Sequence, residues 1–383
     1  MQLFDPHSND WLISKYEHYA VLRNRPSLWW SDKYNLYPIT KYEDVVFVLS
    51  NPDKFSSANG NLINEFPIRI GRTLASNDNP KHDNLKQLIK DAYTKENIDR
   101  VSTAVAEKAK LFLEYKQDFN LSEWSLNIAS WLSLEIMNIP YDSTVLHTLL
   151  LGMLKRSDKS ISSNFYTTSE EDSIAFATIL RKLISDKQPA LGPGVYSEYI
   201  KNCDHDTHGL FFFTAAIYPG GTSTAGALEF LIHDLYINKD SRNRVINNPG
   251  LIRSAVAESL RYNTSTSRFL RTTASEVEIQ NTLIPKGMRI AVCLDSANRD
   301  PEQWEDADIF DIDRNTAKTV SFGYGIHICI AQAITRETLI KVLNVFLEYY
   351  PEYKVSPSKN EFIYLMTAPG NFDFVTNLYI TRP

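Results

Sequence analysis

The residues with the clearest capacity for chemistry lie in the segment Ser321-Phe-Gly-Tyr-Gly-Ile-His-Ile-Cys-Ile-Ala-Gln332. Two glycines two positions apart allow a tight backbone turn and a close approach to a flat partner. A helix is expected to begin near Cys329, and the free N–H groups and dipole of a helix N-terminus favour a negatively charged sulfur. A thiolate held in this way is a strong axial ligand for haem iron.

The alternative for Cys329 is a buried structural cysteine beside an ordinary glycine turn. That alternative would be favoured for an isolated cysteine. Here five of the eight positions from Phe322 to Cys329 carry the pattern Phe-Gly-x-Gly-x-His-x-Cys, and this combination favours the haem ligand.

This segment resembles the haem-ligand loop of the cytochrome P450 family, the haem-thiolate monooxygenases. One departure is Ala331, because the family usually has Gly two residues after the cysteine. The resemblance implies haem b as the cofactor, Cys329 as the metal ligand and Phe322 as part of the cofactor-binding loop. Further family motifs follow in the family's order, from about Tyr37 to the end of the chain.

The resemblance also implies charged donors for the two haem propionates, which need such donors if they are to be buried. The segment Asn79-Pro-Lys-His-Asp-Asn-Leu-Lys86 resembles the family's His-x-x-x-Arg, so His82 and Lys86 are expected to bind a propionate. Lysine provides a point charge in place of the arginine fork, which predicts a looser contact. Arg271 and His327 match two further propionate donors. For His82, the alternative is a surface histidine near a helix start.

Glu258 and Arg261 are spaced i, i+3, so they share a helix face and can form an ion pair. Alone, such a pair is usually a solvated surface contact that contributes little. The resemblance implies instead a buried structural network behind the haem. Many family members have a further arginine where this chain has Ile309, and Arg314 is the candidate to replace it. The following residues 263–269 correspond to a family segment near the substrate.

The segment Tyr218-Pro-Gly-Gly-Thr-Ser-Thr-Ala225 departs from the family pattern Ala/Gly-Gly-x-Asp/Glu-Thr, whose acid and threonine relay protons over the iron. One alignment puts Gly220 on the family glycine, Thr222 on the acid and Ser223 on the threonine. A shift by one residue puts Ser223 on the acid and Thr224 on the threonine. The carboxylate is missing in both, and a hydroxyl donates a hydrogen bond but does not titrate near neutral pH.

We therefore expect Thr222, Ser223 and Thr224 to handle protons. Two interpretations stay open for the missing acid. One is an ordinary monooxygenase in which water and hydroxyl groups relay the protons, and the other is altered chemistry.

The elements that must position these residues are mostly helical. Periodicity predicts helices over residues 101–115, 124–137, 143–154 and 173–185, and a long apolar helix over 209–236 that Pro219 and its glycines interrupt. Residues 271–279 and 283–294 alternate like strands, and a hairpin is expected from residue 362. These elements predict a mainly α protein with a minor β component. The resemblance implies the cytochrome P450 fold, with residues 1–383 as a single triangular haem domain.

Composition excludes several classes of protein. Of 383 residues, 43% are hydrophobic and 22% are charged, which is typical of a soluble globular chain. The net charge of -6 argues against a basic nucleic-acid-binding surface. Cys203, Cys293 and Cys329 form no disulfide or zinc pattern, which favours a reducing compartment. Since neither a signal peptide nor a long apolar run is found, we expect a cytoplasmic protein that does not span a membrane.

These observations lead to one expected function and two rivals. The resemblance implies insertion of one oxygen atom into a small organic substrate, with electrons from a separate ferredoxin or flavodoxin, and secondary-metabolite tailoring is the role expected from the family's habit. Lys318, Arg336 and Lys341 are expected to form a basic docking patch for that donor. One rival is an atypical haem enzyme, a peroxygenase, coupling enzyme or isomerase. The other is a catalytically silent module that recruits a carrier protein, and the intact Cys329 argues against it.

Overall fold

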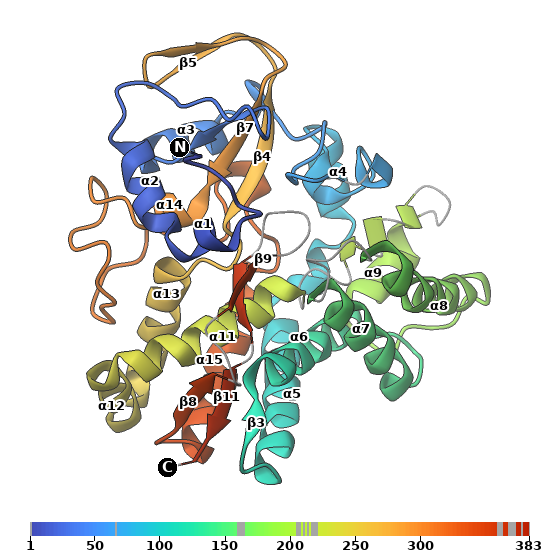
Figure 1. Cartoon of the computed structure of the whole chain (residues 1–383). Coiled ribbons are helices and arrows are strands. Elements are labelled where there is room, and N and C mark those ends of the chain that lie inside the picture. Colours follow the sequence, from blue (N-terminus) through green and yellow to red (C-terminus); the bar gives the residue numbers. More distant parts are fainter. Residues whose placement is uncertain are drawn as a thin grey trace.

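The computed structural model describes residues 2–65, 67–158, 165–203, 208–209, 211–212, 214–215, 221–357, 363–366, 373–376 and 378–382. Helices dominate the described chain, and short strands form a smaller part (Figure 1). The helices are α1 (Asn9–Ile13), α2 (Lys15–Arg23), α3 (Tyr42–Ser50), α4 (Lys81–Gln87), α5 (Lys95–Glu114), α6 (Leu121–Met137), α7 (Ser143–Asp158), α8 (Phe165–Ser185), α9 (Val195–Asn202), α11 (Thr222–Ile237), α12 (Lys239–Asn247), α13 (Ile252–Tyr262), α14 (Leu294–Ala297) and α15 (Gln332–Tyr349). Single 3₁₀ turns are η1 (Pro67–Arg69), η2 (Leu74–Ser76), η3 (Lys90–Tyr93), η5 (Pro249–Leu251) and η6 (Gly325–His327).

The β component of the described chain consists of four small sheets. The largest has the strand order β1-β7-β4-β2, in which β1 runs parallel to β7 and the other neighbours are antiparallel. The others are β3-β11-β8, β9-β10 and β5-β6, all antiparallel. The strands are β1 (Leu36–Ile39), β2 (Phe55–Ser56), β3 (Phe119–Asn120), β4 (Arg268–Thr273), β5 (Val277–Ile279), β6 (Thr282–Ile284), β7 (Arg289–Cys293), β8 (Lys354–Pro357), β9 (Ile363–Met366), β10 (Asp373–Thr376) and β11 (Leu378–Thr381). This architecture confirms the predicted class, mainly α with a minor β component.

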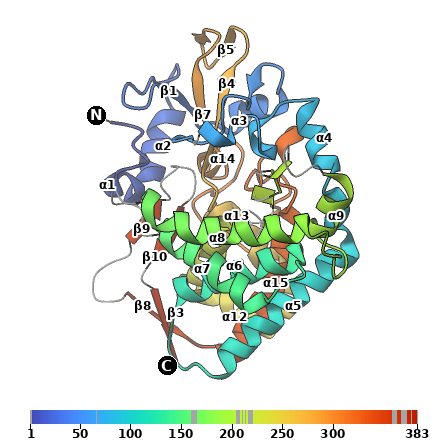
Figure 2. The ribbon, with the colours of Figure 1, turned by 90° about the vertical axis from the view of Figure 1, so that its right-hand side faces the viewer.

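The helical core forms where apolar side chains recur every three or four residues. In α5, Val101, Val105, Ala109 and Leu113 are fully buried, so one continuous stripe faces inward. This stripe packs against α15, and the two helices lie side by side in Figure 2. Helices α6 and α11 complete the core next to α5. Among the described helices, none is both long enough and apolar enough to cross a membrane.

Helix starts are the least accurate part of the sequence-based prediction. Helix α5 begins at Lys95, six residues before the predicted start, because Thr94 caps it and accepts a hydrogen bond from the Asn97 N–H at 3.3 Å. Helix α6 begins at Leu121, where Asn120 accepts from the Glu123 N–H at 3.0 Å. The prediction started each helix at a later apolar residue and overlooked the polar cap.

The predicted helix over residues 209–236 is only partly described. Helix α11 covers its second half, from Thr222 to Ile237, and Gly221 is its N-cap. Residues 210, 213 and 216–220 lie outside the described residues. The predictions made for Pro219 and Gly220 therefore fall outside the described part of the chain.

A buried ionic network links α13 to the irregular segment before the Cys329 loop. Arg261 binds both carboxylate oxygens of Glu258, at 2.8 and 2.7 Å, and both side chains are 0% exposed. The guanidinium of Arg261 also donates to the carbonyl groups of Asn298 and Ala307. Arg314 reaches Glu258 at 3.3 Å, so it takes the place of the third basic residue that the sequence left open. The alternative of a solvated surface pair is wrong.

Replacing Arg261 with Ala should destabilise the protein by about 3–5 kcal/mol, because it leaves the Glu258 carboxylate buried without its principal partner. Arg253 offers a matched control on the same helix, since its pair with Glu337 lies at the surface with the arginine side chain 67% exposed. Arg253→Ala should cost at most about 1 kcal/mol. Urea unfolding of the two variants measures both values, and equal losses would contradict the structural role of the network.

Candidate functional site

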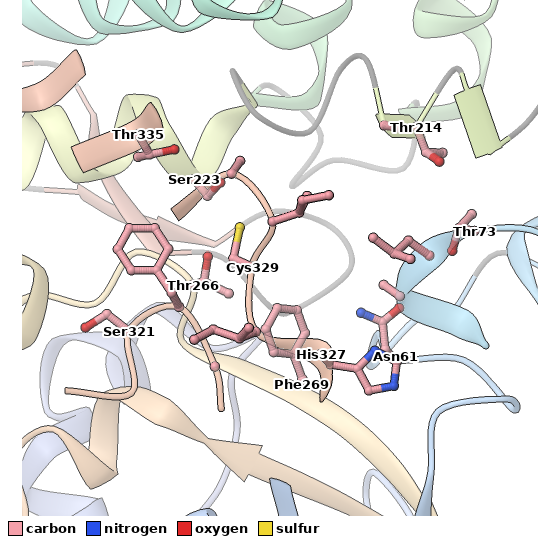
Figure 3. Close-up of a pocket in the computed structure, with 18 of the residues that line it drawn as sticks. Asn61, Thr73, Thr214, Ser223, Thr266, Phe269, Ser321, His327, Cys329 and Thr335 are labelled. Carbon is pink, nitrogen blue, oxygen red and sulfur yellow. The ribbon is translucent and has the colours of Figure 1, made fainter. Parts of the chain in front are cut away.

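One cavity of about 390 Å³ brings together nearly all the predicted site residues. Its wall is formed by the start of α11, by β4, by the Cys329 loop and by the segment from Asn61 to Tyr93 (Figure 3). The predicted residues on this wall are His82, Thr222, Ser223, Thr224, Arg271, Phe322, His327 and Cys329. Lys86 is not among the lining residues, although it lies on α4 one turn beyond His82.

The Cys329 loop is shaped by backbone conformations that favour glycine. Gly323 and Gly325 have φ angles of 76° and 70°, and a Cβ atom at Gly325 would collide with the carbonyl oxygen of Leu49. The Cys329 N–H donates to the Phe322 carbonyl at 2.9 Å, which closes the loop. The Cys329 side chain is therefore accessible from the cavity, as Figure 3 shows.

The sequence predicted that a helix begins near Cys329, but the structure places the helix start after this residue. Helix α15 begins at Gln332, three residues later, because η6 and the Phe322 hydrogen bond hold the preceding loop. Desolvation raises the pKa of the Cys329 thiol, while the backbone N–H groups of Ala331 and Gln332 lower it, and desolvation has the larger effect. The backbone N–H groups alone therefore do not offset the burial of this sulfur. A positive charge next to it, such as a metal ion, would lower its pKa.

A cluster of basic side chains occupies another part of the wall. The rings of His82 and His327 are 4.4 Å apart between centroids, and the Nε2 atom of His327 lies 3.2 Å from the Ser57 hydroxyl. His82 is 1% exposed, so the alternative of a surface histidine is wrong. Arg271 is 5% exposed, and its guanidinium donates to the carbonyl of Leu270.

The pKa shifts in this cluster disfavour the charged forms of its basic groups. Burial, together with the neighbouring Arg271, His82 and Lys86, lowers the pKa of His327 to about 2. Burial likewise lowers the pKa of Arg271 to about 10, while Asp78 acts in the opposite direction. The Asp78 carboxylate already accepts hydrogen bonds from Ser56 and from the Ser57 N–H. An anionic group bound here would raise the pKa values of His327 and Arg271 and relieve the repulsion.

The three predicted hydroxyl residues are the first residues of α11, and all of them line the cavity. The Gly221 carbonyl accepts from the Thr224 N–H at 3.1 Å, which begins the helix at this point. The Ser223 carbonyl accepts from the Ser265 hydroxyl at 2.7 Å. This bond ties the start of α11 to the segment between α13 and β4.

Several lining residues were not predicted individually. Ser265, Thr266 and Phe269 belong to the segment 263–269 that the sequence indicated, and Figure 3 shows Thr266 and Phe269 near Cys329. Asn61, Arg69, Thr73 and Thr214 also line the cavity, and Arg69 pairs with Glu65 at 2.9 Å. Such polar residues in irregular segments have no periodicity or motif, so the sequence carried no signal for them.

Comparisons with known proteins agree with this fold. The family model described as "Cytochrome P450" matches residues 242–371. The protein "Cytochrome p450 CYP199A2" of Rhodopseudomonas palustris is 25% identical over 348 residues, which are 87% of this chain and 83% of the relative.

Two solved structures have the same fold. The structure of "P450BioI in complex with hexadec-9Z-enoic acid ligated Acyl Carrier Protein" has a TM-score of 0.85 at 20% identity and covers 98% of this chain and 100% of its own. The post-tailoring hydroxylase HmtN, involved in himastatin biosynthesis, has a TM-score of 0.81 at 20% identity and covers 96% of this chain and 97% of its own. The solved structures show that the chain has the cytochrome P450 fold, and its sequence is similar to cytochrome P450 proteins over most of its length.

Proposed function

We propose that this protein binds haem b in the cavity and inserts one oxygen atom from dioxygen into a small organic substrate. The observation that carries the proposal is the pairing of two complementary features in one cavity. A cysteine sulfur is accessible on one part of the wall, and a cluster of basic groups without a matching number of carboxylates lies on another. A flat cofactor with a central metal ion and two carboxylates satisfies both.

In this proposal each residue has a stated role. Cys329 would be the metal ligand, and Phe322 would form part of the wall beside the cofactor. His82, Arg271 and His327 bind the propionates, while Lys86 contributes charge from farther away. Bound haem supplies the iron that activates dioxygen, and electron donation from a thiolate ligand favours O–O cleavage.

The hydroxyl groups at the start of α11 supply hydrogen bonds for proton transfer. Among the described lining residues there is no Asp or Glu, so no carboxylate titrates in this cavity near neutral pH. Ser223 and Thr224 can each accept a proton from water and donate one toward the substrate side. Gly220 lies outside the described residues, and its expected contact with the cofactor stays a prediction.

A second candidate follows from the same missing carboxylate. An atypical haem enzyme, such as a peroxygenase, a coupling enzyme or an isomerase, would not need an acid over the iron. The third candidate, a catalytically silent recruitment module, is disfavoured by the accessible sulfur of Cys329. The ratio of product formed to reductant consumed distinguishes the three candidate functions, because only the monooxygenase couples product formation to reductant consumption.

The substrate and the partners belong to the proposal as well. HmtN acts in a biosynthetic pathway and P450BioI binds a substrate carried by an acyl carrier protein, so we propose a tailoring role on a free or carrier-bound small molecule.

A ferredoxin or flavodoxin is proposed as the electron donor. The predicted docking patch is wrong in its composition: Lys341 pairs with Asp99 at 2.7 Å, and Arg336 is half-buried against the Phe322 ring. Only Lys318 of the three is exposed.

The ligand assignment predicts a spectrum. Reduced protein under carbon monoxide should show the red-shifted Soret band of thiolate-ligated haem, and Cys329→His should lose that band while retaining an imidazole-type spectrum. Cys203→Ser serves as the control, because Cys203 does not line the cavity, and it should leave the band unchanged. An imidazole-type spectrum in the wild-type protein would reject Cys329 as the ligand.

The basic cluster predicts graded effects on haem retention. Arg271→Ala should speed haem transfer to apomyoglobin by on the order of 30-fold or more, because removing one partner of a buried charge pair costs about 2 kcal/mol or more. Lys86→Ala should have a smaller effect, since Lys86 is half-buried and does not line the cavity. Lys81→Ala on the same helix is the control and should not change the rate. Equal rates in all three variants would contradict propionate binding by Arg271.

The hydroxyl cluster predicts uncoupling. Ser223→Ala combined with Thr224→Val should lower product per reductant by roughly tenfold or more, while hydrogen peroxide release rises and reductant consumption continues. Thr214→Val is the control, because Thr214 lines the cavity from a different segment and its hydroxyl donates to the Phe211 carbonyl. If the double variant keeps the wild-type ratio of product to peroxide, water or substrate handles the protons instead.

A further inference from the structure

Tyr93 has a buried hydroxyl group that the fold itself does not use. It is the last residue of η3, directly before the cap of α5, and its side chain lines the same cavity as Cys329. Its hydroxyl oxygen is buried and has no hydrogen-bond partner in the described structure. Buried phenol groups usually find a partner, so this one requires an explanation.

Three other tyrosines of the described chain show the usual arrangement. Tyr353 donates to the Ile232 carbonyl at 2.7 Å, Tyr350 to the Lys116 carbonyl at 2.7 Å and Tyr196 to the Gln188 carbonyl at 3.0 Å. Each of these hydroxyls binds a backbone carbonyl of the protein. Tyr93 differs from all three because it lines the cavity, where a bound group can supply the acceptor.

The packing of α5 on α15 brings Tyr93 toward the Cys329 loop. Lys341 of α15 contacts Asp99 near the start of α5, and Tyr349 contacts Glu114 at its end, so the two helices run in the same direction. The N-terminal end of α5, where Tyr93 lies, therefore points toward the beginning of α15, three residues after Cys329. Burial raises the pKa of Tyr93, and a negative charge on Cys329 raises it further, so the two groups lie within electrostatic reach.

We propose that the Tyr93 hydroxyl donates a hydrogen bond to the Cys329 thiolate, directly or through one water molecule, and thereby tunes the reduction potential of the bound iron. This inference rests on the proposed haem ligation by Cys329. The backbone N–H groups of Ala331 and Gln332 already face this sulfur, and Tyr93 adds a side-chain donor from a separate element of the fold.

The physical effect has a definite sign. A hydrogen bond withdraws electron density from the sulfur and stabilises the reduced iron, whose additional electron makes the thiolate more negative. Hydrogen bonds to cysteine ligands are one of the factors by which proteins set the potentials of such centres. Losing the bond should therefore make the iron harder to reduce.

Tyr93→Phe removes the hydroxyl and keeps the ring. We expect the ratio of ferrous to ferric protein at a fixed potential to fall by about threefold to tenfold, and tenfold corresponds to about 59 mV for one electron. Tyr353→Phe is the matched control: it also removes a buried tyrosine hydroxyl, but Tyr353 does not line the cavity. The reduction potential of the Tyr353→Phe variant should equal that of the wild type in a spectroelectrochemical titration.

A second measurement uses the unaltered protein. The Fe–S stretching frequency of ferric wild type should shift in D₂O because the phenol proton exchanges, and Tyr93→Phe should raise the frequency and reduce that isotope shift. An unchanged potential and an unchanged Fe–S frequency in Tyr93→Phe would overturn this inference while the carbon monoxide spectrum still shows thiolate ligation. A wild-type protein without that spectrum would overturn the ligation by Cys329, and this inference with it.

Discussion

Burial of charge is the constraint on which the rest of the site depends. Desolvation raises the pKa of Cys329, and a positive charge beside the sulfur would lower it. On another part of the same cavity wall, desolvation lowers the pKa values of His327 and Arg271, and the charge of Arg271 contributes to the shift of His327. Burial therefore disfavours the anionic form of the sulfur in one region and the cationic forms of the basic groups in the other. One bound group that presented a metal ion to the sulfur and carboxylates to the basic cluster would stabilise both charged forms, and this complementarity is the reason for proposing haem over a simple apolar ligand.

The remaining structure keeps these two regions at a fixed distance from each other. Arg261, Glu258 and Arg314 fasten α13 to the segment that leads into the Cys329 loop, and their charges are compensated within the protein. Strand β4 carries Arg271 and pairs along its length with β7. Helix α15 anchors the other end of the loop through its contact with α5. Since all these elements are buried, the loop is positioned by packing and ion pairs and does not depend on the cofactor alone.

The start of α11 is where this chain departs most from the family pattern. Thr222, Ser223 and Thr224 contribute hydroxyl groups and backbone N–H groups but no carboxylate. The Ser265 hydroxyl binds the Ser223 carbonyl, so the first turn of the helix is held against the segment after α13. A relay built on hydroxyl groups depends on the positions of its members more than on their pKa values, because none of them titrates near neutral pH. The fixed helix start supplies that positioning.

The sequence alone determined the class of the fold and the resemblance to the cytochrome P450 family, and it singled out the residues of the Cys329 loop. Motif spacing carries this information, because the Gly-x-Gly turn and the cysteine are neighbours in the chain and their geometry is local. Helix periodicity likewise located α5, α6, α7 and α8, and it placed the start of α7 correctly at Ser143. The first turns of α5 and α6 depended on polar caps that the periodicity does not include.

The tertiary structure decided everything that depends on burial and on contacts between distant segments. In the folded protein Arg314 pairs with Glu258, and His82 is buried against His327. Lys341 pairs with Asp99, so its charge is not free for the predicted docking patch. The tertiary structure also brought Tyr93, which no motif marks, to the cavity that Cys329 lines. A residue's charge state and partners depend on the solvent and the side chains around it in space, and residues far apart in the chain supply most of those neighbours.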